Sequence, residues 1–254
     1  MREINSAPWR LLSCRPMKLL LPLALSLAVL SLVLAADVPG QLIFQDDFSR
    51  SDNGSAADAP GNGWSTNSKA RAKGHKQVDI RDGAMYITIN AEADHAVTVQ
   101  HAAEFTNGSV TLRFMLADPR DSLGLDFADP ACKEVHAGHL LAARVAAKQV
   151  LLQDLKTGAM RNDIHEARQA KQKLTADQEQ ALKGKQKAVP LPISVGQWHD
   201  LLVSIVGDTL SVSVDGKFVG ELKSPGIAHP TKKLLRLAVP RNAVVDDLRI
   251  WRKD

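Results

Sequence analysis

The sequence predicts an all-β fold, a sandwich of two antiparallel sheets that is interrupted by a short helical insertion. Apolar residues alternate with more polar ones in many short segments, and turn sequences recur at intervals of about ten residues. The clearest segment, residues 196–222, encodes two successive hairpins, because Gly207-Asp208 and Asp215-Gly216 interrupt the alternation. Asp-Gly pairs accept the positive φ angles of two-residue turns. This pattern is typical of a β-sandwich or barrel.

The other strands are predicted by the same alternation. The first covers residues 42–48 and is followed by a surface loop at 49–63, which is rich in Gly, Ser, Asp, Asn and Pro. Residues 139–154 form a hairpin or, because of their alanines, contain a short helix. The remaining strand candidates are residues 78–81 and 84–90, joined by an Asp-Gly turn, and residues 96–102, 109–117, 123–129, 234–239 and 243–251.

Residues 160–187 depart from the β pattern. They are rich in Ala, Gln, Lys, Glu and Arg and contain no valine or aromatic residue, which favours helix. Thr175 and Gln178 have the spacing of a capping box. We expect two short helices that separate near residues 173–174. From Lys156 to Lys187 the chain has eight basic and four acidic residues, which predicts a solvated helical surface or, as an alternative, a surface for a protein partner.

The beginning of the chain has the order of a secretory signal peptide. Lys18 precedes an uncharged apolar run that ends in small residues, and we expect cleavage after Ala35 or Ala36. Residues 1–36 are therefore predicted to be a leader and signal peptide, with either Met1 or Met17 as the start, and residues 37–254 a single exported domain. Export would be to the periplasm, the cell surface or the medium. An uncleaved membrane anchor is disfavoured by the short run.

Charge and cysteine content exclude several classes of protein. The net charge is +4, but the leader has four basic residues and one acidic residue, so its +3 leaves only +1 for the rest. We therefore expect no nucleic-acid surface and, beyond the signal peptide, no membrane contact. Cys14 belongs to the leader, so Cys132 has no partner within the domain. Stability must come from the core rather than from a disulfide.

Three segments resemble a known superfamily. They are GQWHDLLVSIVGDTLSVSVDGKFVG at residues 196–220, VVDDLRIW at 244–251 and FQDDFSR at 44–50. They resemble the concanavalin A-like lectin/glucanase superfamily, in particular the laminin-G-like and 3-keto-disaccharide hydrolase-type domains of exported bacterial proteins. The resemblance covers most of residues 41–254. It implies a jelly-roll sandwich with the helical insertion 160–187 outside the common pattern.

The resemblance is informative for fold and weak for activity, because this superfamily contains lectins, hydrolases and passive modules. We expect a carbohydrate-associated binding or structural module, without catalytic activity, whose partner is a glycan. A glycoside hydrolase of the 3-keto-disaccharide type, acting on the concave sheet, is one alternative, and a protein-interaction module that uses the basic insertion is another.

No catalytic motif matches residue by residue. The retaining glycosidases of this superfamily place carboxylates on one strand in the pattern Glu-x-Asp-x-x-Glu, and the segment 92–97 approaches this pattern but lacks its last acid. If hydrolysis occurs, the weak candidates are Asp126, Asp129, His136 and His139, which lie close together in sequence near a strand end. His136 and His139 are three residues apart, so on a strand they point to opposite faces, which favours a structural role over a shared metal.

The first and last strands each contain an acid at an apolar position. Side chains alternate between the two faces of a strand, and this alternation places Asp46 and Asp246 on the same face as their apolar neighbours, toward the core. A carboxylate in the core needs a hydrogen bond, a cation or a metal. We expect these strands to be neighbours, so the two acids could share a structural calcium ion or an inward-turned Arg such as Arg113. A β-bulge that turns either acid to solvent is the alternative. No other cofactor is expected.

Among the tryptophans, Trp64 is the candidate sugar contact. It lies in a Gly/Asn/Ser setting that is typical of an exposed loop. Trp198 follows a turn glycine and Trp251 ends the last strand, so we expect both to pack against the sandwich. The sequence does not determine the oligomeric state.

Overall fold

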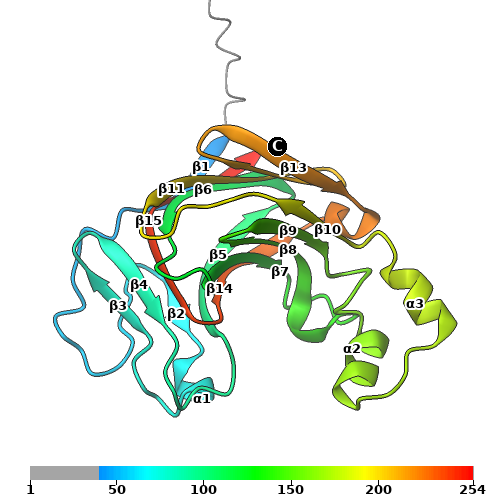
Figure 1. Cartoon of the computed structure of the whole chain (residues 1–254), viewed down its shortest axis with the longest axis horizontal. Helices are drawn as coiled ribbons and strands as arrows, with labels where there is room; N and C mark the ends of the chain where they lie inside the picture. The colour runs from blue at the N-terminus through cyan, green and yellow to red at the C-terminus, as the bar shows by residue number, and fades with distance from the viewer. Residues whose placement is uncertain (1–39, 254) are drawn as a thin grey trace, which may run out of the picture. The chain divides into compact units, whose positions relative to one another are not determined.

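The computed structural model describes residues 40–253, and these residues form two stacked antiparallel sheets (Figure 1). This arrangement confirms the predicted all-β sandwich. The predicted leader lies outside the described residues. No helix among residues 40–253 is long and apolar enough to span a membrane.

The first layer, sheet A, is organised around the long strand β15 (Asn242–Lys253). β6 (Asn107–Met115) runs along one side of β15, while β1 (Gln41–Asp46) and β4 (Ala84–Thr88) share its other side. The first and last strands are therefore neighbours, as predicted. The sheet is completed by β3 (Val78–Arg81) beside β4, and by β11 (Trp198–Val206), β12 (Thr209–Val214) and β13 (Lys217–Lys223) beyond β6.

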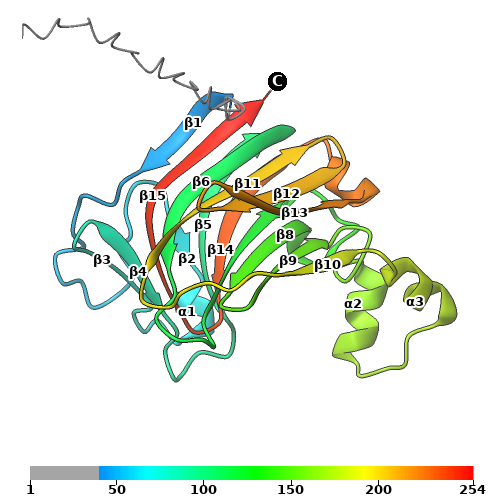
Figure 2. The same cartoon turned by 45° about the horizontal axis from the view of Figure 1, so that its top comes forward.

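The second layer, sheet B, has β7, β14 and β8 at its centre, and both views show it packed under sheet A (Figures 1 and 2). Its strands are, in spatial order, β10 (Gln186–Pro190), β9 (Gln149–Asp154), β8 (His139–Ala146), β7 (Ser122–Ala128), β14 (Lys232–Val239), β5 (Val97–Phe105) and β2 (Ser65–Thr66). The hairpin predicted at residues 139–154 is β8 and β9, so the helical alternative was wrong.

The predicted hairpin turns are present. Asp215 and Gly216 have φ angles of 51° and 71°, and Asp82 and Gly83 have 52° and 70°. Positive φ at both central residues is the signature of a type I′ turn, whose twist matches that of the strands it joins. The turn chemistry in the sequence therefore determines where these strands reverse.

Strand alternation separates a core face from an outer face in sheet B. In β7 the side chains of Leu123, Leu125 and Phe127 are fully buried in the core between the sheets. The intervening residues, which include Gly124 and Asp126, therefore point to the opposite side of the sheet. We call this side the outer face of sheet B.

The helical insertion has the predicted form. It contains α2 (Asn162–Gln169) and α3 (Ala176–Leu182), and the Thr175 capping box is complete. β10 begins at Gln186, slightly before the predicted end of the insertion. The base of the insertion is held by Asp154, which accepts hydrogen bonds from Thr157 and Ser224. The other short helices are α1 (Ser68–Arg71), η1 (His136–Gly138) and η2 (Pro225–Ala228).

Candidate functional site

A row of polar side chains crosses the outer face of sheet B. The backbone register places Asp126 of β7 between Arg236 of β14 and Ala142 of β8. Gln100 of β5 and Gln153 of β9 extend the row on either side. Residues in register on neighbouring strands point to the same face, so these side chains lie together. The row runs between β2 and α1 at one end and α2 and α3 at the other (Figure 1).

Asp126 and His139 form a hydrogen-bonded pair at the centre of this face. Nδ1 of His139 lies 2.5 Å from Oδ2 of Asp126. Asp126 is 7% exposed, and its Oδ1 is buried without a hydrogen-bond partner among the described residues. Nε2 of His139 likewise forms no hydrogen bond within residues 40–253, and the His139 side chain is 23% exposed. The pair therefore has one ring nitrogen and one carboxylate oxygen that the described protein leaves unbonded.

Two further imidazoles stack beside this pair. The ring centroid of His136 lies 6.2 Å from that of His139 and 3.8 Å from that of His165 on α2. The backbone N–H of His136 donates to the carbonyl of Met160 at 2.8 Å, which joins η1 to the start of the insertion. Burial lowers the pKa of His136, and so, to a smaller extent, do the positive charges around it. His136 is thus predominantly neutral near pH 7.

Asp129, the fourth catalytic candidate, does not belong to this group. Its carboxylate accepts a hydrogen bond from the backbone N–H of Ala131 at 2.8 Å and pairs with His229 at 3.3 Å and Lys233 at 3.5 Å. Burial raises the pKa of Asp129, but these partners outweigh burial and leave it below its usual value. Asp129 therefore stabilises the turn after β7. The structure brings together Asp126, His136 and His139 and adds His165.

Trp64 is buried, which corrects the expectation of an exposed sugar contact. It is 6% exposed and packs against Phe44 and Phe48. Its Nε1 donates to Oδ2 of Asp46 at 2.8 Å. The Gly- and Asn-rich sequence before Trp64 is a loop, as expected, but the ring turns into the core because its N–H has a buried acceptor there.

Asp46 faces inward, as parity predicted, and its partner is an arginine. Arg50 donates from Nη1 to Oδ1 at 2.7 Å and from Nη2 to Oδ2 at 2.9 Å, and the backbone N–H of Phe48 also donates to Oδ1. Burial raises the pKa of Asp46, but the hydrogen bonds together lower it below its usual value. The guanidinium and the Trp64 indole occupy both oxygens, so a calcium ion does not fit here. The inward arginine is Arg50 rather than the expected Arg113.

Asp246 does not share that site, and a β-bulge is the reason. The register of β15 shifts between Asp246 and Arg249, and Asp247 has a φ of 52°. The shift moves the core positions from Val245 to Leu248, so Asp246 is on the outer side of sheet A. There its Oδ2 lies 3.3 Å from Nη1 of Arg113. The predicted alternative, in which a β-bulge turns the acid away from the core, was correct for Asp246 and wrong for Asp46.

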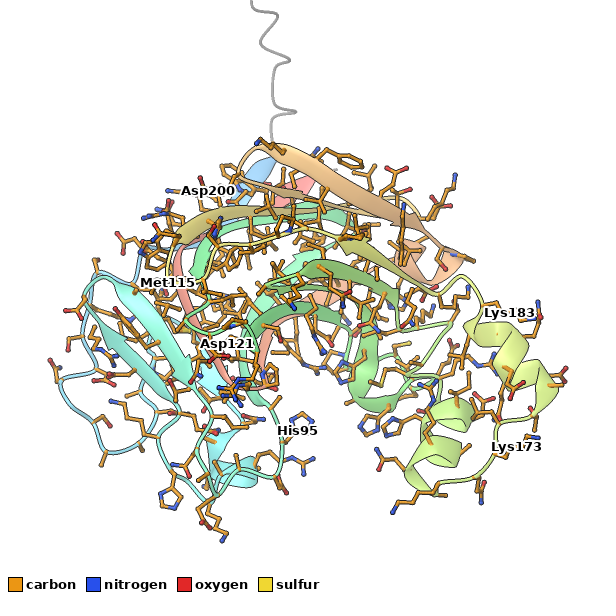
Figure 3. All side chains as sticks on the ribbon, viewed as in Figure 1. His95, Met115, Asp121, Lys173, Lys183 and Asp200 are labelled. Atoms are coloured by element: carbon orange, nitrogen blue, oxygen red, sulfur yellow. The ribbon has the colours of Figure 1, made fainter. Side chains whose placement is uncertain are left out.

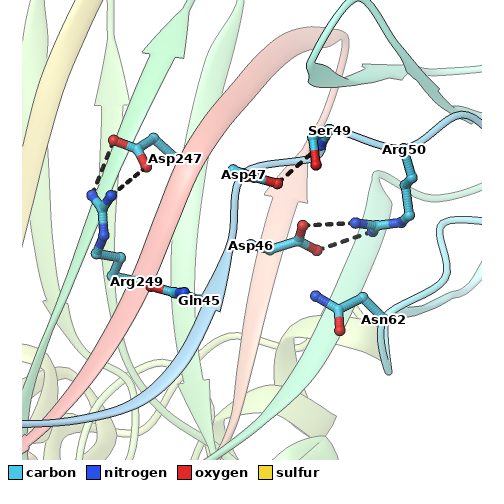
Figure 4. A pocket seen from close by; sticks show the side chains of 8 residues that line it. All are labelled: Gln45, Asp46, Asp47, Ser49, Arg50, Asn62, Asp247 and Arg249. Carbon is cyan, nitrogen blue, oxygen red and sulfur yellow. Dashed lines mark hydrogen bonds and ion pairs between the residues drawn. The ribbon is translucent and has the colours of Figure 1, made fainter.

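A polar pocket of about 460 Å³ lies beside Asp46 (Figure 4). Four of its charged groups form two pairs, Asp46 with Arg50 and Asp247 with Arg249, while Asp47 accepts a hydrogen bond from the backbone N–H of Ser49 at 3.0 Å. Within residues 40–253 no group of three or more His, Cys, Asp or Glu side chains could hold a metal ion. Most of its charge is therefore neutralised internally, whereas the Asp126–His139 pair on the outer face of sheet B has an unbonded carboxylate oxygen. The lining residues are Gln45, Asp46, Asp47, Ser49, Arg50, Asn62, Asp247 and Arg249.

Five residues on or beside the outer face were missed from the sequence: Gln100, Gln153, Arg144, Arg236 and His165. Arg144 and Arg236 interrupt apolar strands at outward positions, a signal that alternation alone could have supplied. His165 lies in a helix of the insertion, and nothing in its local sequence indicates that it stacks on His136.

Comparison with known proteins identifies the fold. No protein-family model matches the chain, and no curated protein matches its sequence. The laminarinase from Rhodothermus marinus is similar in structure, with a TM-score of 0.56 and 12% identity over 84% of this chain and 97% of that one. SCLam, an endo-beta-1,3(4)-glucanase of family GH16, has a TM-score of 0.52 and 14% sequence identity, and the match covers 83% of this chain and 90% of that one. The Crh5 transglycosylase has a TM-score of 0.50 and 12% sequence identity, and the match covers 83% of this chain and 84% of that one. The chain therefore has the concanavalin A-like jelly-roll fold that the sequence predicted.

Proposed function

We propose that this protein is an exported carbohydrate-binding module that holds its glycan on the outer face of sheet B without cleaving it. The observation that carries the proposal is the Asp126–His139 pair, whose Oδ1 and Nε2 have no partner within the described residues. A buried carboxylate oxygen without a hydrogen bond is costly, which a purely structural role does not explain, and the partly exposed ring of His139 leaves Nε2 to a sugar hydroxyl. The exported location is supported by the apolar leader sequence.

The neighbouring side chains suit a sugar. Ala142 and Ala238 are small, Gly124 has no side chain, and Gln100 and Gln153 supply amide donors and acceptors along the row. A polar row of this kind supplies hydrogen bonds to the hydroxyls of a sugar laid along it. The concanavalin A-like fold supports the same class of ligand, because the three similar structures are named as a laminarinase, a glucanase and a transglycosylase.

The acids on this face argue for binding rather than retaining hydrolysis. The central strands β7, β8 and β14 contain a single acidic residue, Asp126. Retaining glycosidases need two carboxyl groups about 5 Å apart. Asp126 has a histidine in hydrogen-bond contact instead of a second acid. The segment 92–97, which approached the glycosidase motif, lies between β4 and β5 and pairs with surface cations through Glu92 and Asp94.

A second candidate function is hydrolysis with His139 as a general base. The carboxylate of Asp126 would orient the ring through Nδ1 and leave Nε2 free to take a proton from water, which is the geometry of a base held by an acid. This arrangement favours the 3-keto-disaccharide hydrolase alternative over a retaining glycosidase. It needs no second carboxylate.

A glycan array followed by titration of the best ligand tests the proposal. We expect binding that Asp126→Asn and His139→Gln each weaken about tenfold or more, because each removes a charge-assisted hydrogen bond. His199→Gln is the matched control: His199 also pairs with an aspartate, Asp215, at 2.8 Å, but on sheet A. Release of shorter sugars, measured by mass spectrometry and abolished by His139→Gln, would replace the binding module by the hydrolase. Absence of binding to every glycan would refute both.

A further inference from the structure

The outer face of sheet B has two arginines without a carboxylate partner. Eight other arginines of residues 40–253 form ion pairs with aspartates. Arg144 is exposed and has neither a hydrogen bond nor an ion pair within those residues. Arg236 donates from Nη2 to the carbonyl of Ala137 at 3.0 Å and pairs with no acid of the described chain. Charge is usually balanced locally in this protein, but on this face it is not.

The backbone places Arg144 over an open part of the sheet. Arg144 of β8 is in register with Gly124 of β7, and Gly124 is in register with Ala238 of β14. Nε of Arg144 lies 3.8 Å from the position that a Cβ on Gly124 would occupy. The guanidinium therefore lies across the strand that has no side chain at this point, with its planar donor edge accessible to a ligand.

No acid of the central strands is free to balance the two arginines. The one acid of the central strands, Asp126, is already hydrogen-bonded to His139. After burial, the groups that lower the pKa of His136 are His165, His139, Arg236 and Arg71, of which Arg71 is itself paired with Asp94. An anion brought to this face would be attracted by Arg236, whose charge no acid of the described chain balances.

The helical insertion extends this charge along one side of the face. Residues 160–187 have seven basic and four acidic side chains. Lys173 and Lys183 lie on the insertion, and His95 lies across the outer face from them (Figure 3). Arg168 of α2 lines a small cavity of about 90 Å³ together with Gln153, which is in the polar row. The polar row therefore ends beside Arg168.

We propose that the glycan held on this face is acidic, with carboxylate or sulfate groups that pair with Arg144 and Arg236. The inference rests on the proposed carbohydrate-binding function. A guanidinium presents two parallel N–H donors that match a carboxylate or a sulfate, which explains why arginine rather than lysine is present at both outward positions. A neutral glucan would leave both charges uncompensated when it covered them.

Matched pairs of ligands test the charge requirement. Oligogalacturonate and its methyl ester form one pair, and laminarin sulfate and laminarin form the other; affinity is measured by isothermal titration calorimetry at low and high salt. We expect one acidic member to bind at least about tenfold more tightly than its neutral partner, with the difference reduced by salt. Which pair shows the difference separates carboxylate from sulfate.

Variants identify the groups responsible. Arg144→Gln and Arg236→Gln should each weaken binding of the acidic ligand about tenfold, and Arg144→Lys should restore only part of the loss because it removes the paired donors. Arg120→Gln is the control, since Arg120 is exposed and paired with Asp118 in the loop between β6 and β7. Thermal melting shows that each variant is folded.

The outcomes distinguish the two proposals. Equal or tighter binding of the neutral members would overturn the acidic ligand and leave the carbohydrate-binding function standing. Equal weakening by Arg120→Gln and Arg144→Gln would also overturn it, because the effect would then be one of net charge. Failure of all four ligands and of the glycan array would refute the proposed function itself.

Discussion

Asp46 and Asp126 are both buried aspartates, yet their surroundings differ in completeness. Asp46 accepts four hydrogen bonds, two from Arg50, one from the Trp64 indole and one from the backbone of Phe48. Asp126 has one hydrogen-bond partner, His139, and its Oδ1 has none within the described chain. A satisfied carboxylate stabilises the fold, whereas a buried carboxylate with an unsatisfied oxygen is not explained by stability alone.

The neighbouring cations show the same difference. Arg50 and Arg113 on the sheet A side are each paired with an aspartate. Arg144 and Arg236 on the outer face of sheet B are not, although Asp126 is in register with Arg236. The first region is therefore a set of interactions that join β1, β6, β15 and the Trp64 loop. The second region is a surface with unused hydrogen-bonding capacity.

Substitution of the two aspartates should give the largest difference. Asp46→Ala leaves the Arg50 guanidinium and the Trp64 N–H without their acceptor, so we expect the free energy of unfolding to fall by about 3–5 kcal/mol. Asp126→Ala removes one hydrogen bond and one unsatisfied oxygen, so we expect a loss of at most about 1 kcal/mol. Urea denaturation measures both. Equal losses would show that the two aspartates have the same structural role.

Substitution of Trp64 tests the structural role of Asp46 by removing one of its hydrogen-bond donors. Trp64→Phe keeps most of the core packing but removes the N–H that donates to Asp46, and we expect a loss of about 1.5–3 kcal/mol because the acceptor is charged. Trp251→Phe is the control, since the Trp251 N–H contacts the hydroxyl of Thr111 at 3.5 Å and should matter less. Glycan affinity should be unchanged by either substitution. A loss of affinity in Trp64→Phe alone would restore Trp64 as a sugar contact.

The pH dependence of stability should show the smallest effect. The pKa of Asp46 is lowered in the folded protein, so its contribution is fully present above the unfolded pKa of about 3.9 and is lost as the pH falls through the folded pKa. We therefore expect the difference in unfolding free energy between the natural protein and Asp46→Asn to shrink as the pH falls from about 6 to about 3. Chemical denaturation at each pH measures this difference. A difference that grows on acidification would contradict the assignment.

The protein-interaction alternative cannot be tested by deleting the helical insertion, because α2 packs against the rest of the domain. Ile164 and Ala167 of α2 are buried, and His165 stacks on His136. Deletion of residues 160–187 would therefore alter the outer face of sheet B as well as the basic surface. Substitution of exposed lysines such as Lys173 and Lys183 separates the two roles, and the interaction stays a prediction until that experiment.

Local sequence determined the secondary structure of this protein and the class of its fold. The hairpins of residues 196–222, the turn at Asp82-Gly83 and the cap at Thr175 follow from alternation and turn chemistry within a few residues, so each could be predicted without knowledge of the rest. The predicted leader lies outside the described residues and stays an expectation. Asp126, His136 and His139 could be named as candidates because they are close in sequence.

Tertiary structure decided what those candidates contact, because sheet register joins residues far apart in the chain. Arg236 reaches the carbonyl of Ala137 across 99 positions, and only strand order places β14 beside β7. Parity also failed where a single residue shifted the register: the bulge at Asp247 turned Asp246 outward while Asp46 stayed in the core. Alternation predicts a face only while the register is unbroken, and neither a bulge nor a long-range partner is encoded in the local pattern.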